Sequence, residues 1–249
     1  MRSANPTLKA GTFEQFRDFT ESSTMTIGGT ANKTLVLLLF LAASAAFSWN
    51  AMMNGGAAVP PIGLVLGGAI IGLVFATITV FKPRWASFTA PLYALAEGAV
   101  LGGISALFEA RYPGIAFQAV CLTFCTLFGL LGAYKSGLIK ATENFKLGVC
   151  AATGGICLVY LVSFVVNMIW GFGTMPYIHS AGPIGIGISA FVVVIAALNL
   201  VLDFDFIENG AEIGAPKYME WYAAFGLLVT LVWLYLEILR LLSKLSRRD

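Results

Sequence analysis

The sequence has 249 residues, of which 58% are hydrophobic and only 11% are charged, and its formal net charge is +2. Since an ordinary soluble domain has about 25% charged residues, the composition excludes that class and predicts an integral membrane protein. The small net charge gives no basis for a nucleic-acid partner. The partner that the composition predicts is the lipid bilayer.

Residues 1–33 precede every long apolar run and mix polar, acidic and basic side chains. Phe13, Phe16 and Phe19 are spaced to lie on one face of a short interfacial helix. The first apolar run begins too late, and lacks the small-residue pattern, for a cleaved signal peptide. We therefore predict a polar N-terminal leader on the cytoplasmic side.

Seven apolar segments follow the leader, and each is long enough to cross a membrane. A hydrocarbon core of about 30 Å requires about 20 apolar residues per helix. Residues 34–249 are therefore predicted to form one all-α domain of seven transmembrane helices. The predicted spans are 34–52, 61–81, 88–108, 115–134, 147–170, 183–202 and 221–242.

Lysine and arginine in short loops predict the orientation of these spans. Cytoplasmic loops carry the excess of basic residues, and with seven spans the loops opposite the leader hold only Arg111. The leader's side is therefore predicted to be cytoplasmic. Its basic residues are Arg2, Lys9, Arg17, Lys33, Lys82, Arg84, Lys135, Lys140, Lys146 and Lys217.

The basic C-terminal tail contradicts this rule. Seven spans place Arg240, Lys244, Arg247 and Arg248 on the far side. Either the last helix inserts regardless of its flanking charges, or one of the last two segments is re-entrant and the tail returns. We favour seven spans, because both segments have about 20 residues without a break.

Acidic residues at the end of the sixth span and inside the seventh are the candidate functional groups. Asp203 and Asp205 open an acidic run that also has a simpler interpretation as a solvated helix end. Glu237 lies about 24 Å along the last helix, short of its polar end. Its simpler interpretation is an i,i+3 pair with Arg240.

Two further charged residues complete the candidate set. Glu97 is an acid about nine residues into the third span, beside Gly98, and is expected to face other helices and not lipid. Arg84, after the second span, shares a membrane face with the loop that begins at Asp203, so the guanidinium and that carboxylate could meet. Gly98 and Gly102 form a small-xxx-small spacing that predicts close helix packing.

No signature of an enzyme is present in the sequence. It contains no nucleophile elbow, no zinc-binding His-Glu pattern and no Walker loop. The motif contexts of an intramembrane aspartyl protease are also missing around the acids. We predict a protein that is not an enzyme and has no cofactor.

Three sequence stretches carry a resemblance to a known family. They are Asn199-Leu200-Val201-Leu202-Asp203-Phe204-Asp205-Phe206-Ile207-Glu208, Leu234-Tyr235-Leu236-Glu237-Ile238-Leu239-Arg240, and Leu95-Ala96-Glu97-Gly98-Ala99-Val100-Leu101-Gly102. With their order and the basic end of the second span, the chain resembles the bacterial branch of the Bax inhibitor family of membrane proteins over its whole length.

The resemblance implies a fold, a function and a site. Six helices would surround a central seventh, and the protein would be a pH-sensitive calcium leak in a bacterial inner membrane. The controlling acids would be Asp203 and Glu237, with Arg84 as an alternative partner of Asp203. The match departs from the family in two ways: Glu237 replaces the usual Asp, and the connection from Asp203 is about ten residues longer. Asp205 could therefore replace Asp203.

The chemistry of such an acidic pair follows from electrostatics. Two carboxylates within hydrogen-bonding reach cannot both ionise cheaply, so they would share a proton and latch the two helices together. Loss of that proton would separate them. Asp203 and Glu237 would also form a weak site for calcium, a hard cation that takes oxygen ligands.

Two other functions remain open at the sequence level. The same acids could relay protons in a proton-coupled transporter of a small solute. Alternatively, the Phe-rich leader could bind a membrane protease or another membrane-protein partner in a stress response, with no transport at all.

Overall fold

The structure is a computed structural model that describes residues 24–54, 62–170 and 182–247. Within these ranges it contains seven α-helices and one short 3-10 helix, with no β-strand. The elements are α2 (Ile27–Asn54), α3 (Ile62–Phe81), η1 (Pro83–Trp85), α4 (Ala86–Arg111), α5 (Ile115–Lys135), α6 (Glu143–Trp170), α8 (Pro183–Glu212) and α9 (Met219–Ser246).

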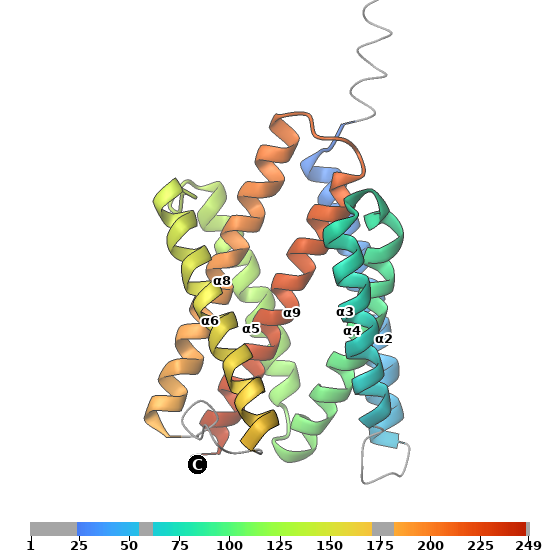
Figure 1. The fold of residues 1–249 in the computed structure, drawn as a ribbon, viewed down its shortest axis with the longest axis vertical. Helices are drawn as coiled ribbons and strands as arrows, with labels where there is room; N and C mark the ends of the chain where they lie inside the picture. Colours follow the sequence, from blue (N-terminus) through green and yellow to red (C-terminus); the bar gives the residue numbers. More distant parts are fainter. Residues whose placement is uncertain (1–23, 55–61, 171–181, 248–249) are drawn as a thin grey trace, which may run out of the picture.

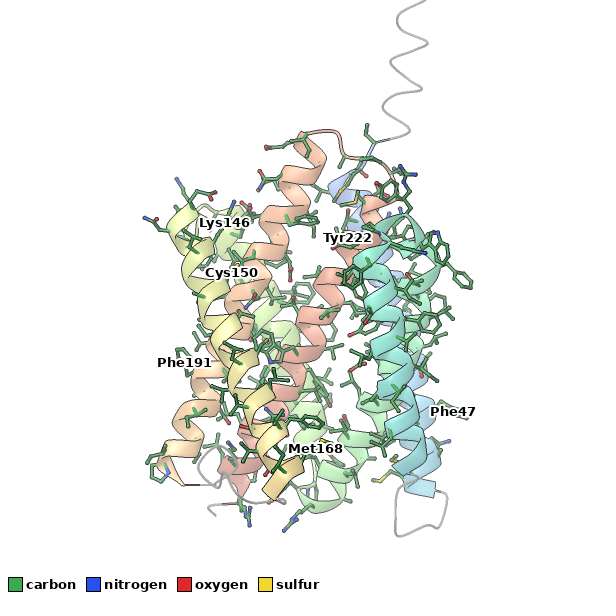
Figure 2. The ribbon with its side chains drawn as sticks, in the orientation of Figure 1. Phe47, Lys146, Cys150, Met168, Phe191 and Tyr222 are labelled. Atoms are coloured by element: carbon green, nitrogen blue, oxygen red, sulfur yellow. The ribbon has the colours of Figure 1, made fainter. Side chains whose placement is uncertain are left out.

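The helices have the length and composition of a multi-pass membrane protein. Six of them are long and apolar enough to cross a bilayer, and α3 contributes a shorter apolar stretch, Val65–Phe81. Large apolar side chains cover the outside of the bundle; Phe47, for example, is 73% exposed and points away from α2 (Figure 2). Such a surface is stable against lipid tails. The predicted all-α membrane fold is confirmed.

The chain runs back and forth along the bundle, so α2 begins at one end and α9 ends at the other (Figure 1). Neither α8 nor α9 is re-entrant, because each is one continuous helix of 30 and 28 residues, respectively. We call the end with the start of α2 the N-terminal end and the other the C-terminal end.

Two helices are longer than predicted. α2 begins at Ile27, inside the segment predicted as a leader. α8 continues past residue 202 to Glu212, and carries Asp205 and Glu208 as half-exposed and exposed residues. The aromatic residues of the predicted interfacial helix, Phe13, Phe16 and Phe19, lie outside the described residues.

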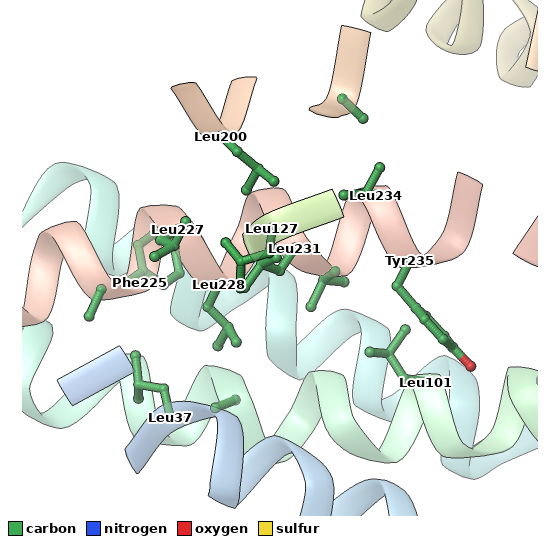
Figure 3. Close-up of a cluster of buried hydrophobic side chains, with 14 of the residues drawn as sticks. Leu37, Leu101, Leu127, Leu200, Phe225, Leu227, Leu228, Leu231, Leu234 and Tyr235 are labelled. Atoms are coloured by element: carbon green, nitrogen blue, oxygen red, sulfur yellow. The ribbon is translucent and has the colours of Figure 1, made fainter. Parts of the chain in front are cut away.

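Helix α9 lies in the middle of the bundle (Figure 1) and is the most buried of the candidate spans. It contacts α2, α4, α5 and α8, whereas α3 packs on α4 and α6 packs on α8. Leu228, Leu234 and Leu239 of α9 are almost completely buried. Figure 3 shows part of the apolar cluster around α9, including Leu228 and Leu234.

The packing of α2 against α4 depends on small residues. A Cβ atom on Gly98 or Gly102 would collide with the backbone carbonyl oxygen of Leu41 or Ala45, respectively. The close approach lets the Ser48 hydroxyl donate to the Ala99 carbonyl oxygen at 2.8 Å. The predicted role of Gly98 and Gly102 in close helix packing is confirmed.

This packing predicts the effect of adding one methyl group. Gly102→Ala should destabilise the protein by about 1–3 kcal/mol, because α2 and α4 must move apart. Gly129→Ala in α5 is the matched control, since a Cβ there meets nothing within 4 Å and both variants gain the same helix propensity. Thermal unfolding in detergent measures both; equal melting temperatures would contradict the close contact.

The directions of α2 and α9 predict the topology of the termini. A reporter fused after residue 249 should lie across the membrane from a reporter fused before residue 1, because seven helices separate them. Alkaline phosphatase and fluorescent-protein fusions at each terminus report the side. Both termini on one side would contradict seven crossings.

Candidate functional site

Asp203 lies on the side of α8 that faces α9. Its helical neighbours Leu200 and Ile207, three residues before and four residues after it, are buried against α9. The carboxyl group forms a hydrogen bond with the Thr230 side chain of α9. Its second oxygen, Oδ2, is buried and has no hydrogen-bond partner among the described residues. A buried polar atom without a partner is costly, which marks a functional candidate.

Glu237 lies deeper in the bundle and is 2% exposed. Its Oε1 accepts a hydrogen bond from the Tyr160 hydroxyl of α6 at 2.9 Å and another from Arg240 Nη1 at 2.7 Å. Arg240 Nη1 also donates to the Tyr160 hydroxyl at 2.8 Å, which closes a triangle. The i,i+3 pair with Arg240 is therefore present, and Tyr160 ties it to α6.

The second oxygen of Glu237 resembles that of Asp203. Oε2 is buried and, like Oδ2 of Asp203, has no hydrogen-bond partner in the part of the chain described. Each acid thus has one oxygen that forms a hydrogen bond and one oxygen without a hydrogen-bond partner among the described residues. Such atoms are able to bind a proton or a cation without first breaking a hydrogen bond.

The structure does not bring the two carboxyl groups into hydrogen-bonding contact. Asp203 is level with Thr230, and the Lys244 ammonium of α9 donates to the Ser189 hydroxyl of α8 at 2.8 Å. Both contacts fix one antiparallel register, in which Glu237 is level with Ala196. Glu237 is seven residues beyond Thr230, or about 10 Å along the helix. The acids form two separate sites.

The connection between the two acids is mostly helical. α8 continues past Asp203 to Glu212, and α9 begins at Met219. Between the two acids, α9 is packed with buried Leu231 and Leu234 (Figure 3). The described conformation therefore has a layer of apolar side chains between the two carboxyl groups.

Asp205, the alternative partner of Glu237, has a different role. Its carboxylate forms an ion pair with Lys146 of α6 at 2.8 Å, and Lys146 also contacts Glu143 at 3.3 Å. Lys146 lies at the N-terminal end of the bundle (Figure 2). Asp205 thus belongs to a rim network that joins α8 to α6.

Arg84 and Glu97 are not gathered at either acid. Arg84 lies exposed in η1, and forms no ion pair with an acid of the described residues. η1, the element that contains Arg84, contacts α9. It lies at the N-terminal end of the bundle, towards which α8 runs from Asp203 (Figure 1). Glu97 is half-buried and faces α3, where a Cβ on Gly72 would lie 2.9 Å from its Oε2. The prediction that Glu97 faces another helix is confirmed.

Sequence reasoning missed a fully buried acid, Glu220, in the first turn of α9. Glu220 is 0% exposed and accepts hydrogen bonds from the backbone and side chain of Thr26, each at 2.9 Å. Lys33 of α2 and Lys217 form ion pairs with it. In the sequence, an acid three residues after Lys217 is typical of a solvated helix start. The contacts from Thr26 and Lys33 could not be predicted, because these residues are distant in the chain.

A preformed metal centre is not found in the described residues, where no group of three or more His, Cys, Asp or Glu side chains converges. Calcium takes six to eight oxygen ligands. Asp203 and Glu237 do not form one joint site in this conformation, so each would contribute to a separate and weak one.

The ion pair of Glu237 predicts a stability effect. Arg240→Gln should destabilise the protein by about 2 kcal/mol, because it leaves Glu237 buried beside Tyr160 without the Arg240 counter-charge. This value already includes a reduction for solvent screening, since the Arg240 side chain is 38% exposed. The double variant Arg240→Gln/Glu237→Gln should recover most of the loss. Thermal unfolding measures each variant; a double variant less stable than Arg240→Gln alone would contradict the pairing.

Comparison with known proteins assigns the chain to a family. The family model described as Bax inhibitor 1 like matches residues 5–247, which is nearly the whole chain. No curated protein and no solved structure matches it.

Proposed function

Because the chain belongs to the Bax inhibitor 1 like family, we propose that it is a pH-sensitive, calcium-permeable leak channel controlled by Asp203 and Glu237. The observation that carries the proposal is the pair of buried, unpartnered carboxylate oxygens, Asp203 Oδ2 and Glu237 Oε2. Buried acids in a membrane protein mark ion or proton pathways. We further propose a bacterial inner membrane as its location, with the N-terminal end in the cytoplasm.

The two acids act in series along α9 in this mechanism. A direct carboxyl-to-carboxyl latch would require α8 and α9 to slide by about 10 Å, roughly two helical turns. Separate sites need no such slide. With Asp203 protonated and Glu237 neutralised by Arg240, the apolar layer of Leu231 and Leu234 stays closed. When Asp203 is ionised, its carboxylate attracts water and calcium and favours separation of α8 from α9.

The partners of the two acids determine which acid needs a proton or a cation to become neutral. Glu237 has a fixed counter-charge in Arg240, whereas Asp203 has only the neutral Thr230 side chain. Asp203 therefore depends on a proton or a cation to become neutral. We propose Asp203 as the pH-sensing acid, Glu237 as the inner ion site, and Arg84 as a competing partner for Asp203 when the helices move.

Calcium flux into liposomes tests this function. With wild-type protein, flux should rise as the pH is raised through neutrality, because deprotonation opens the path. Asp203→Asn should reduce the flux by roughly tenfold, equivalent to about 1.4 kcal/mol, and should abolish its pH dependence. Glu237→Gln should reduce the flux at all pH values.

Asp205→Asn is the matched control, since it makes the same acid-to-amide change in the rim pair with Lys146. Its flux should keep the wild-type pH dependence. Absence of calcium flux in the wild type, or unchanged flux in the Asp203 and Glu237 variants, would refute the proposal. Saturable solute uptake driven by a pH gradient would identify a proton-coupled transporter instead.

A further inference from the structure

A basic cavity lies at the C-terminal end of the bundle, between the last turns of α4 and α9. Its volume is about 460 Å³. Leu107 and Phe108 form an apolar wall. The polar lining consists of Arg111, Tyr112, Arg240, Ser243, Lys244 and Arg247. Among the described residues, four cations therefore line this cavity and no acid does.

Hydrogen bonds hold two of these cations at the cavity wall. Lys244 is 6% exposed, and its ammonium donates to the Gly185 carbonyl oxygen at 3.0 Å and to the Ser189 hydroxyl at 2.8 Å. Arg240 is held through Nη1, which donates hydrogen bonds to Glu237 and Tyr160. Its Nε and Nη2 make no hydrogen bond to the described residues.

The other two cations have no acidic partner in the part of the chain that the structure describes. Arg111 and Arg247 are exposed and form no ion pair with any carboxylate of the residues described. Glu109, the nearest acid to Arg111 in sequence, accepts instead from the backbone N–H of Ala116 at 3.1 Å, at the start of α5. Like charges held in one cavity repel each other unless an anion joins them.

We propose that this cavity binds the phosphate group of an anionic ligand. Guanidinium groups are planar forks that match phosphate oxygens in pairs. Basic cavities between transmembrane helices bind anionic headgroups, and this cavity lies at the end of the bundle where α4 and α9 end. The ligand is a phospholipid headgroup, with its chains along Leu107 and Phe108, or a free phosphate anion, which presents the same oxygens.

The proposal is independent of calcium permeability and accounts for the basic tail. Arg240, Lys244 and Arg247 violate the distribution of basic residues expected for this end of the protein. A bound anion would offset the positive charge of Arg247 and Arg111 and hold the end of α9 against α4.

The test uses the full-length protein with two probes. Protein extracted from bilayers of phosphatidylglycerol and phosphatidylcholine in equal amounts is examined by native mass spectrometry for retained lipid. Separately, thermal unfolding is recorded with and without inorganic phosphate. The variant is Arg111→Gln/Arg247→Gln, and Lys135→Gln/Lys140→Gln removes two exposed cations from the opposite end as the matched control.

Wild type and control should retain phosphatidylglycerol in preference to phosphatidylcholine, and the Arg111/Arg247 variant should not. Each basic group near a membrane contributes about fivefold in affinity, so the double variant should bind roughly 30-fold more weakly. Stabilisation by inorganic phosphate that is lost only in this variant would support a free anion as the ligand.

Equal binding by wild type and the Arg111/Arg247 variant in both arms would overturn the proposal, as would equal losses in variant and control. If the double variant unfolds, Arg247→Gln alone is used, since Arg247 lies beyond the last turn of α9. It should weaken binding about fivefold; unchanged binding would count against the cavity.

Discussion

Helix α9 carries buried charged side chains in the middle of an apolar bundle, and burial removes them from solvating water. Each of these groups therefore has to find a partner on a surrounding helix, because a bare buried charge costs several kcal/mol. Glu220 is satisfied by Thr26 and Lys33 of α2, Glu237 by Arg240 and by Tyr160 of α6, and Lys244 by α8. The arrangement of the helices depends on these contacts as well as on apolar packing.

The same contacts determine how α8 and α9 are aligned. Asp203 with Thr230 and Ser189 with Lys244 give one register at two well-separated levels. That register keeps Asp203 and Glu237 apart, with an apolar layer between them. The protonation switch that we propose would therefore act on two distinct carboxyl groups, each with its own partner.

The two ends of the bundle differ in how they handle charge. At the N-terminal end, basic residues meet acids, as in the network of Asp205, Lys146 and Glu143 and in the contacts of Glu220. At the C-terminal end, Arg111 and Arg247 line a cavity to which the described residues contribute no acid. Acids of the protein pair with several cations at the N-terminal end, whereas the cavity at the C-terminal end is suited to the anion that we propose.

Local sequence determined the class of fold and the positions of the long apolar helices, because apolar run length is a property of the chain itself. Tertiary structure alone decided the partners. The alternatives of Asp203 or Asp205 beside Glu237 could not be separated in sequence, since α8 carries both two residues apart; only the packing turned Asp203 toward α9 and Asp205 toward Lys146. Burial of Glu220 and the cavity around Arg111 were equally invisible, because each joins residues from helices distant in the chain, and such contacts exist only once the bundle has closed.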